Sequence, residues 1–242
     1  LFGWQANQSP DRLTTPLVRV GGELRPATWD EAMARVVERS RNLLRDHGPQ
    51  SMGFYNSGQL FTEDYYTLAV MVRGGLGSPH LDGNTRLCTA TSDVALKETF
   101  GTDGDPGTLE DFDVCDTVFA VGHNMPDTHT VMWMRVLDRL RGPKPPRIVV
   151  VDPRPTRIAA EAVVHLRVLP GTNVALLNCI QRELFELGAI DSEFVAAHTI
   201  GLERLAATVA EYDPERVSQI CGVPADEIRA AARVLAESER LV

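Results

Sequence analysis

The sequence predicts an α/β protein with a three-layer, mostly parallel sheet flanked by helices. From residue 113 onward, short apolar runs alternate with segments of helical periodicity, the order that produces right-handed βαβ units. One run, Arg147–Val151, is β-branched throughout its apolar part, as in a strand buried on both faces. Successive runs end at polar, turn-forming residues. These features together predict a Rossmann-like sheet, with a smaller α/β portion at the N-terminus.

The N-terminal part contains less regular elements. We expect Leu1–Pro26 to be irregular apart from a hairpin turn at Gly21–Gly22. Thr28 and Glu31 form a capping box, which starts a helix that Gly48–Pro49 ends. Beyond it the patterns predict a strand at Ser51–Tyr55 and a helix at Thr62–Gly74. A Gly-rich connection, Gly74–Arg86, leads to a second helix at Thr91–Phe100.

The remainder alternates strands with helices. The predicted strands are Cys115–Val121, Arg147–Val151 and Val164–Leu169. The predicted helices are Thr128–Arg141, Thr156–Ala162, Asn173–Leu187, Ser192–His198, Leu202–Ala210, Pro214–Cys221 and Pro224–Ser238. A further strand is expected to begin at Leu241–Val242, so we expect the chain to be a piece of a longer protein.

Composition excludes several classes of function. The 242 residues, 43% hydrophobic and 24% charged, suit one large or two smaller globular domains. A net charge of −9 argues against a nucleic-acid partner. The apolar stretches are shorter than the roughly 18 residues that cross a bilayer, so no membrane segment is expected. The four cysteines have no CxxC spacing and are interpreted as reduced thiols, which favours the cytoplasm, with the periplasm as the alternative.

Polar turns follow the first two strands of the α/β part, at the carboxyl edge where such sheets bind ligands. After the first strand, Gly122 allows a ligand to approach the backbone, and Asn124 can bond to a phosphate or sugar. After the second, Asp152 can accept ribose hydroxyls and Arg154 can face a phosphate. A simple turn and a surface ion pair are the structural alternatives.

The third turn opens a helix, with Gly171, Thr172 and Asn173 in succession. Helix capping explains these residues, but free backbone N–H groups also suit a polar ligand, and an amide such as Asn173 can pair with a purine edge. Thr156 can cap the helix after the second turn. His129 can contact a phosphate, and the alternative is a surface histidine satisfied by its own surroundings. The three turns together predict a nucleotide-cofactor site, and the missing GxGxxG pattern argues against ordinary NAD binding.

Cys88 is a candidate metal ligand. It lies in a loop of small residues before a helix, where a thiol ionises more readily, and Arg86 is close in sequence. A thiolate is a soft ligand suited to a heavy transition metal. The alternative is a small buried side chain, which is also how we interpret Cys115, Cys179 and Cys221.

The ordered set of motifs resembles the molybdopterin oxidoreductases of the dimethyl sulfoxide reductase superfamily. The matching segments are Ser9–Leu17, Arg25–Ala32, Asn84–Cys88, Gly122–Asn124, Asp152–Arg154 and Pro170–Asn173. The resemblance implies molybdenum held by two molybdopterin guanine dinucleotides, with Cys88 as the catalytic protein ligand of the metal. The expected cofactor-binding residues are Arg86, Gly122, Asn124, His129, Asp152, Arg154, Thr156, Gly171, Thr172 and Asn173. Many relatives have Asp in place of Asn173.

The resemblance also implies an activity. Formate dehydrogenases usually have histidine after their cysteine or selenocysteine, whereas Thr89 follows Cys88 here. The segment Asn84–Cys88 is more similar to that of the assimilatory and periplasmic nitrate reductases. We therefore expect reduction of nitrate to nitrite by oxygen-atom transfer, with electrons from a donor protein or domain. Alternatives are a formate dehydrogenase, a non-catalytic relative such as the large iron–sulfur subunit of complex I, and a separate nucleotide-binding module.

Relatives carry sequence that this chain does not. Their four-cysteine motif precedes the segment that matches Leu1, so a [4Fe-4S] cluster is expected outside this chain. They also extend past the point that matches Val242, with a domain for the second dinucleotide. We expect residues 1–83 to be part of a discontinuous α/β domain and residues 84–242 to be a dinucleotide-binding α/β domain. The isolated chain is expected to be inactive.

Overall fold

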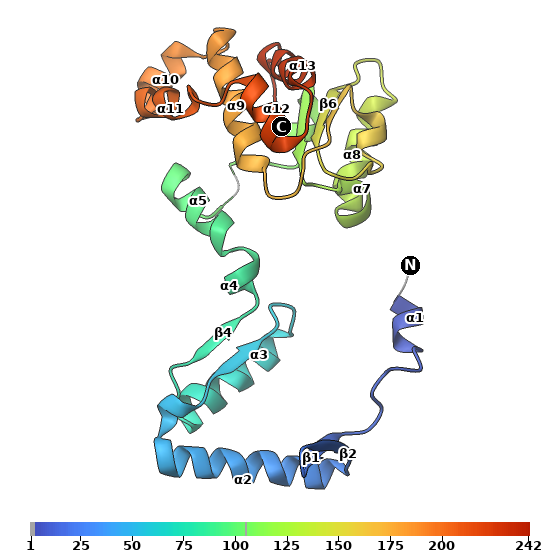
Figure 1. Ribbon diagram of the computed structural model, residues 1–242, viewed down its shortest axis with the longest axis vertical. Coiled ribbons are helices and arrows are strands. Elements are labelled where there is room, and N and C mark those ends of the chain that lie inside the picture. The colour runs from blue at the N-terminus through green and yellow to red at the C-terminus, as the bar shows by residue number, and fades with distance from the viewer. Residues whose placement is uncertain (1–2, 105) are drawn as a thin grey trace. The chain divides into compact units, whose positions relative to one another are not determined.

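The computed structural model describes residues 3–104 and 106–242, and the chain divides into two compact units (Figure 1). The N-terminal unit is Leu1–Gly104 and the C-terminal unit is Asp105–Val242. Residues 84–104, with Arg86 and Cys88, therefore lie in the N-terminal unit. Every helix among the described residues is too short or too polar to cross a bilayer.

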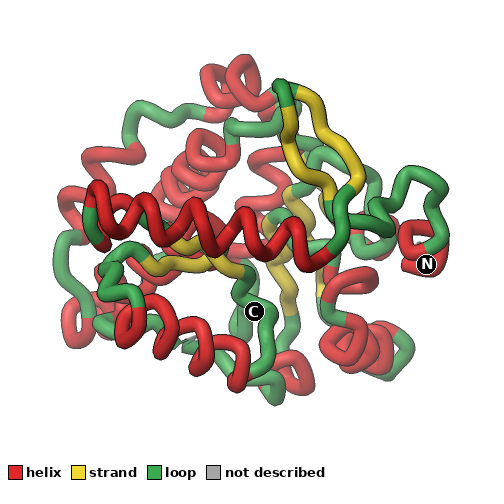
Figure 2. Tube along the Cα trace, turned by 90° about the horizontal axis from the view of Figure 1, so that it is seen from below, coloured by secondary structure: helices red, strands yellow, loops and turns green. Residues whose placement is uncertain are grey.

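The N-terminal unit begins with α1 (Gly3–Asn7) and the predicted hairpin, in which β1 (Leu17–Val20) pairs antiparallel with β2 (Glu23–Pro26). The uninterrupted helix α2 (Trp29–His47) follows (Figure 2). Its predicted capping box is present: the Glu31 amide donates to Thr28 Oγ1 at 3.2 Å, and the Thr28 amide donates to Glu31 Oε2 at 2.7 Å. The capping box therefore fixes where α2 starts.

The rest of this unit is a short parallel pair of strands with helices. After the 3₁₀ turn η1 (Pro49–Ser51), β3 (Phe54–Asn56) pairs with β4 (Leu81–Gly83). The helices are α3 (Thr62–Ala69), its π-helical continuation η2 (Val70–Gly75), α4 (Thr85–Cys88) and α5 (Ala90–Phe100). The expected Gly-rich connection thus contains β4, which is too short to show a periodicity and forms by pairing with β3.

The C-terminal unit contains a parallel sheet in the order β5 (Thr117–Val121), β6 (Arg147–Val151) and β7 (Val164–Leu166). On the other side of β5, Leu241 forms a parallel bridge with Thr117, where we expected a strand to begin. The strand β7 is shorter than predicted. The amide of Val168 donates to Leu166 O and that of Leu169 donates to Cys221 O, so the chain leaves β6 after Leu166.

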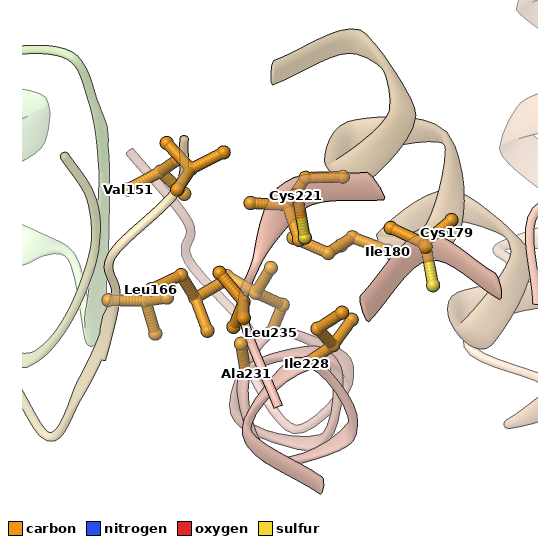
Figure 3. Close-up of a cluster of buried hydrophobic side chains, with 13 residues drawn as sticks. Val151, Leu166, Cys179, Ile180, Cys221, Ile228, Ala231 and Leu235 are labelled. Carbon is orange, nitrogen blue, oxygen red and sulfur yellow. The ribbon is translucent and has the colours of Figure 1, made fainter. Parts of the chain in front are cut away.

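Helices cover both faces of this sheet. On one face lie α6 (Asp111–Val114), α7 (Met125–Thr128), α8 (Thr130–Leu140) and η3 (Ala159–Glu161), and on the other lie α9 (Asn173–Glu186), α12 (Pro214–Cys221) and α13 (Ala225–Ala236). The unit also contains α10 (Ser192–His198) and α11 (Leu202–Val209), and α11 packs against α9. Side chains alternate along β6: Val149 and Val151 pack with α9, α12 and α13 (Figure 3), while Ile148 and Val150 pack with α6, α7 and α8. The predicted three-layer architecture is confirmed.

Three cysteines belong to these cores, as predicted. Cys115 packs in the cluster with α8, while Cys179 and Cys221 pack in the cluster with α13 (Figure 3). Burial raises the pKa of the Cys179 thiol to about 12, so this thiol stays protonated and unreactive at neutral pH. These thiols stabilise the unit as small apolar groups.

Candidate functional site

The three parallel strands of the C-terminal unit end at one level. Val121 is in register with Val151, and Val151 with Leu166. The amide of Gly122 donates to Val151 O at 2.8 Å, so pairing continues to the first loop residue. The loops that carry the predicted residues therefore start side by side at the carboxyl edge of the sheet. These loops hold Gly122, Asn124, His129, Asp152, Arg154, Thr156, Gly171, Thr172 and Asn173.

The loop after β5 turns at Gly122, whose φ of +63° lies in the region that favours glycine. Asn124 follows as the residue before α7, and its Nδ2 donates to Asp127 Oδ2 at 2.7 Å. The side-chain oxygen of Asn124, Oδ1, is buried and has no hydrogen-bond partner. A buried amide oxygen without a donor costs free energy, which a ligand that donates to it would recover.

The loop after β6 uses its carboxylate internally. Asp152 is buried, at 4% exposure, and its Oδ1 accepts a hydrogen bond from the Arg154 amide at 2.8 Å. The Arg154 side chain is 71% exposed, and its Nε lies 3.9 Å from Asp152 Oδ1. The hydroxyl of Thr156 is buried without a partner. Asp152 thus shapes the loop, while the Arg154 side chain extends into solvent and the Thr156 hydroxyl has no partner.

The helix α9 follows the third loop. Gly171 has φ +88°, and the Thr172 hydroxyl donates to Leu169 O at 2.7 Å. Thr172 precedes the helix but its side chain does not cap it, so the predicted capping hydrogen bond is not formed. Asn173 is exposed at the first turn of α9. The first backbone N–H groups of α9 remain without a side-chain acceptor, as a polar ligand requires.

Contacts between the loops hold this edge together. Arg157 Nη1 lies 4.0 Å from Asp127 Oδ1, which joins the loop after β6 to α7. His165 Nε2 lies 2.8 Å from Asp152 O. A cavity of about 540 Å³ brings the second and third loops together, since Pro153 and Pro170 both line it, with His165 and Arg167. His165 and Arg167 were not predicted from the sequence, because they lie in or beside a strand and belong to no turn motif.

Two histidines meet at the first loop. His123 Nε2 lies 2.9 Å from His129 Nδ1, and the rings are edge to face with centroids 4.7 Å apart. His123 is half-buried and His129 is exposed. Burial lowers the pKa of His123, and the neighbouring His129 lowers it further. His123 was not among the predicted residues, because its contact with His129 depends on the short helix α7 between them.

Cys88 and Arg86 lie in the N-terminal unit, beyond the carboxyl end of the parallel pair β3 and β4. Cys88 is exposed, unlike the other three cysteines, and ends α4 two residues before α5 starts. Arg86 Nε donates to Asp82 Oδ2 at 2.8 Å, and this hydrogen bond lowers the pKa of Asp82. The positive charge of Arg86 is therefore shared with a carboxylate. The expectation that Cys88 and the loops of the C-terminal unit hold the same cofactor stays a prediction.

Protein side chains alone do not form a metal site here. Within residues 3–104 and 106–242, no group of three His, Cys, Asp or Glu side chains is arranged to hold a metal ion. At the carboxyl edge of the C-terminal sheet, two buried polar atoms, Asn124 Oδ1 and Thr156 Oγ1, have no hydrogen-bond partner, which fits a polar group of a cofactor.

Comparison with known proteins shows which sequences this chain resembles. The chain is 37% identical over 235 residues to a nitrate reductase of Symbiobacterium thermophilum and 35% identical over 241 residues to a periplasmic nitrate reductase of Desulfovibrio desulfuricans. It is 34% identical over 224 residues to the alpha subunit of F420-dependent formate dehydrogenase 1 of Methanococcus maripaludis. These alignments cover 94%, 95% and 93% of this chain, but only 31%, 32% and 32% of the relatives. The chain thus spans about a third of their length.

The fold agrees as well. The structure of acetylene hydratase from Pelobacter acetylenicus superimposes with a TM-score of 0.69 at 24% identity, over 97% of this chain and 32% of that enzyme. At this identity the likeness shows the fold alone. The family model for molybdopterin oxidoreductases matches residues 12–204. Because that match spans most of the sequence, the chain belongs to the molybdopterin oxidoreductase family.

Proposed function

We propose that the C-terminal unit binds one molybdopterin guanine dinucleotide at the carboxyl edge of its sheet. The observation that carries this proposal is the pair of buried, unpartnered atoms, Asn124 Oδ1 and Thr156 Oγ1, on two adjacent loops. An amide oxygen needs a donor, which a ribose hydroxyl or a guanine N–H supplies. A hydroxyl such as that of Thr156 either donates or accepts.

Charged and backbone groups on the same edge would hold the phosphates. Arg154 is exposed and carries a planar guanidinium suited to phosphate oxygens. The uncapped N–H groups at the start of α9 favour negative charge, and the exposed ring of His129 adds a further donor. Gly122 and Gly171 turn the chain without side chains that would obstruct a ligand. Asp152 keeps the second loop in shape.

In the N-terminal unit we propose that Cys88 is the protein ligand of molybdenum, with Arg86 beside it. The exposed position of Cys88 supports this role. When bound, the cofactor would supply the redox chemistry by which nitrate loses an oxygen atom and becomes nitrite. Thr89 after Cys88 and the nitrate reductase relatives favour nitrate as the substrate. Formate dehydrogenase is the second candidate, because its alpha subunits align over most of the chain.

The rest of the proposal concerns the whole protein. We propose a second molybdopterin guanine dinucleotide and a [4Fe-4S] cluster bound outside this chain, and a donor protein or domain that reduces them. The domain assignment of residues 1–83 and 84–242 belongs to the same proposal. A cytoplasmic location is proposed, with the periplasm as the alternative since one relative is named a periplasmic enzyme. A non-catalytic relative would have no use for an exposed cysteine at position 88.

The test uses the full-length enzyme that contains this chain. Molybdenum is measured by mass spectrometry and guanine nucleotide by acid hydrolysis, together with nitrate reduction. Asn124→Ala combined with Thr156→Val is expected to lower the guanine nucleotide content, because both loops lose the buried polar atom that has no partner within the protein. Cys88→Ala is expected to abolish nitrate reduction while the guanine nucleotide stays bound. Wild-type protein without molybdenum and guanine nucleotide would overturn the proposal, as would an active Cys88→Ala enzyme.

A further inference from the structure

The cavity between the second and third loops has no role in the site described so far. Its volume of about 540 Å³ lies within the range of about 300–1,000 Å³ that is typical of small-molecule sites. Both loops line it, through Pro153 after β6 and Pro170 before α9, and a further wall is the turn between α12 and α13, residues 222–224. Part of a ligand that lies along the carboxyl edge can therefore enter this cavity.

The wall formed by the turn between α12 and α13 is fixed to the third loop. The Leu169 amide donates to Cys221 O at 2.9 Å. The Leu169 side chain packs so closely on Gly222 that a Cβ at Gly222 would lie 3.2 Å from Leu169 Cγ. Glu227 follows in the first turn of α13, and its amide donates to Pro224 O at 3.0 Å. The backbone that carries Glu227 is thus held in place beside the third loop.

The apolar part of the lining suits a flat ring. Three prolines line the cavity together with two aliphatic side chains: Pro153, Pro170, Pro224, Val168 and Leu169. Proline has no backbone N–H, so these rings offer an apolar surface against which a heteroaromatic base can pack. A phosphate gains nothing from such a surface and loses its hydration there. The lining therefore favours the base of a nucleotide over its phosphates.

Two exposed side chains of opposite charge also line the cavity, Arg167 directly after β7 and Glu227 on α13. Neither forms an ion pair or a side-chain hydrogen bond with any residue of the ranges 3–104 and 106–242. The basic residue of α13 near Glu227, Arg229, pairs instead with Asp226 and Glu215. The cavity thus offers a ligand one group that only donates hydrogen bonds and one that only accepts them.

A carboxylate distinguishes guanine from the other bases. Guanine presents two adjacent donors, N1–H and the N2 amino group, which the two oxygens of a carboxylate accept side by side. Adenine and cytosine present a donor next to an acceptor on that edge, and the acceptor would face a carboxylate oxygen. An amide such as that of Asn173 has one acceptor beside one donor, so it matches guanine less well. A guanidinium such as that of Arg167 matches the guanine acceptors O6 and N7.

We propose that this cavity binds the guanine base of the dinucleotide. Glu227 accepts hydrogen bonds from N1–H and the N2 amino group, and Arg167 donates to O6 and N7. The inference rests on the proposed function, and it adds the residue that selects the base. An acidic residue in the first turn of a helix also stabilises the helix. Asp226 lies in the same turn without lining the cavity, so it is the matched control for Glu227.

The first test measures the binding of free nucleotides to the 242-residue chain by isothermal titration calorimetry at pH 7. IMP is GMP without the N2 amino group. The wild type is expected to bind GMP about tenfold more tightly than IMP, because IMP lacks one hydrogen bond to the carboxylate. AMP is expected to bind more weakly than IMP. Glu227→Gln is expected to bind GMP and IMP equally, since the amide oxygen accepts from one donor only, and Asp226→Asn is expected to keep the wild-type ratio.

Arg167→Met gives a different signature. GMP and IMP both carry O6 and N7, so the loss of the guanidinium is expected to weaken both by the same factor, about tenfold, and to leave their ratio unchanged. Circular dichroism shows that each variant is folded. The inference would be overturned if the wild type bound no GMP, or bound GMP and IMP equally. It would also be overturned if Asp226→Asn lost the preference for GMP as Glu227→Gln does.

The second test uses the full-length enzyme and separates this inference from the proposed function. Guanine nucleotide content is measured after dilution and gel filtration. Glu227→Gln is expected to release the nucleotide of this chain about tenfold faster than the wild type, and Asp226→Asn at the wild-type rate. Wild-type enzyme without guanine nucleotide would overturn the proposed function itself. Wild-type retention in Glu227→Gln would overturn only the role of Glu227.

Discussion

The two units differ in how their secondary structure is supported. In the C-terminal unit, buried side chains fill both faces of the sheet, and β6 is apolar and buried from Ile148 to Val151. Within residues 3–104, Val72 is the only buried hydrophobic residue. The N-terminal unit nevertheless forms a hairpin, a long helix and a parallel pair of strands. Local sequence signals, such as a turn or a capping box, are thus sufficient to define helices and strands. A buried core is what makes a unit independently stable.

The helix α2 illustrates this difference. Its residues Trp29, Met33, Val36 and Val37 recur at helical spacing on one face, and all four are exposed. In α9 and α13 the corresponding apolar positions, such as Leu176 and Ile228, are fully buried. The same amphipathic pattern therefore yields a packed helix in one unit and an uncovered apolar face in the other.

The largest expected difference in unfolding free energy comes from truncating a leucine to alanine in the C-terminal unit and in the N-terminal unit. Leu176→Ala removes a fully buried leucine of α9 and is expected to cost about 2–5 kcal/mol of unfolding free energy. Leu24→Ala, at a position that is 55% exposed in β2, is the matched control, and its expected cost is within about 0.5 kcal/mol. Urea denaturation followed by circular dichroism measures both. Equal losses would contradict the contrast between the units.

A smaller loss of unfolding free energy is expected when Asp116 can no longer bind the C-terminal segment that bridges to β5. Burial on its own raises the pKa of Asp116, but hydrogen bonds from Ser238, Thr117 and the amides of Glu239 and Arg240 outweigh it and lower the pKa to about 2. A lowered pKa means that the ionised form stabilises the fold above the unfolded pKa of 3.8, and that this contribution is lost as pH falls towards 2.

Asp116→Asn is therefore expected to destabilise the C-terminal unit by about 1 kcal/mol at pH 7. The difference from the wild type is expected to shrink between pH 4 and pH 2, where the wild-type carboxylate becomes protonated. Urea midpoints at pH 7, 4 and 3 give the measurement. If the difference in stability between the wild type and Asp116→Asn grew as the pH fell, the ionised Asp116 carboxylate would not be its cause.

An effect of similar size, but confined to one helix, is expected at the capping box. Thr28→Ala removes the acceptor of the Glu31 amide and is expected to cost α2 about 1 kcal/mol, or about fivefold faster amide exchange in its first turns. Hydrogen exchange read out by NMR or mass spectrometry gives the rates for each element. Amides of β6 should not change, because they belong to the other unit. A parallel change in β6 would show that the two units unfold together.

The sequence predicted most of the C-terminal unit, because its signals are local and strong. The β-branched run Arg147–Val151 identified the central strand, and the strand ends placed the predicted turns at the carboxyl edge of the sheet. The sequence did not reveal that the Thr172 hydroxyl bonds to Leu169 O in place of capping α9, since both arrangements use the same residue. The contact of His123 with His129 was missed for a similar reason: it depends on the one-turn helix between them. In the N-terminal unit, periodicity identified the apolar face of α2 but not its exposure.

The level ending of the three strands has a consequence for what can bind there. Adjacent strands in a sheet lie about 4.8 Å apart, so loops that leave three neighbouring strands are spread over roughly 10 Å. A compact anion reaches one of these loops, whereas an elongated molecule lying crosswise to the strands reaches all of them. The length and direction of an acceptable ligand are thus set by backbone spacing, before any side chain selects its chemistry.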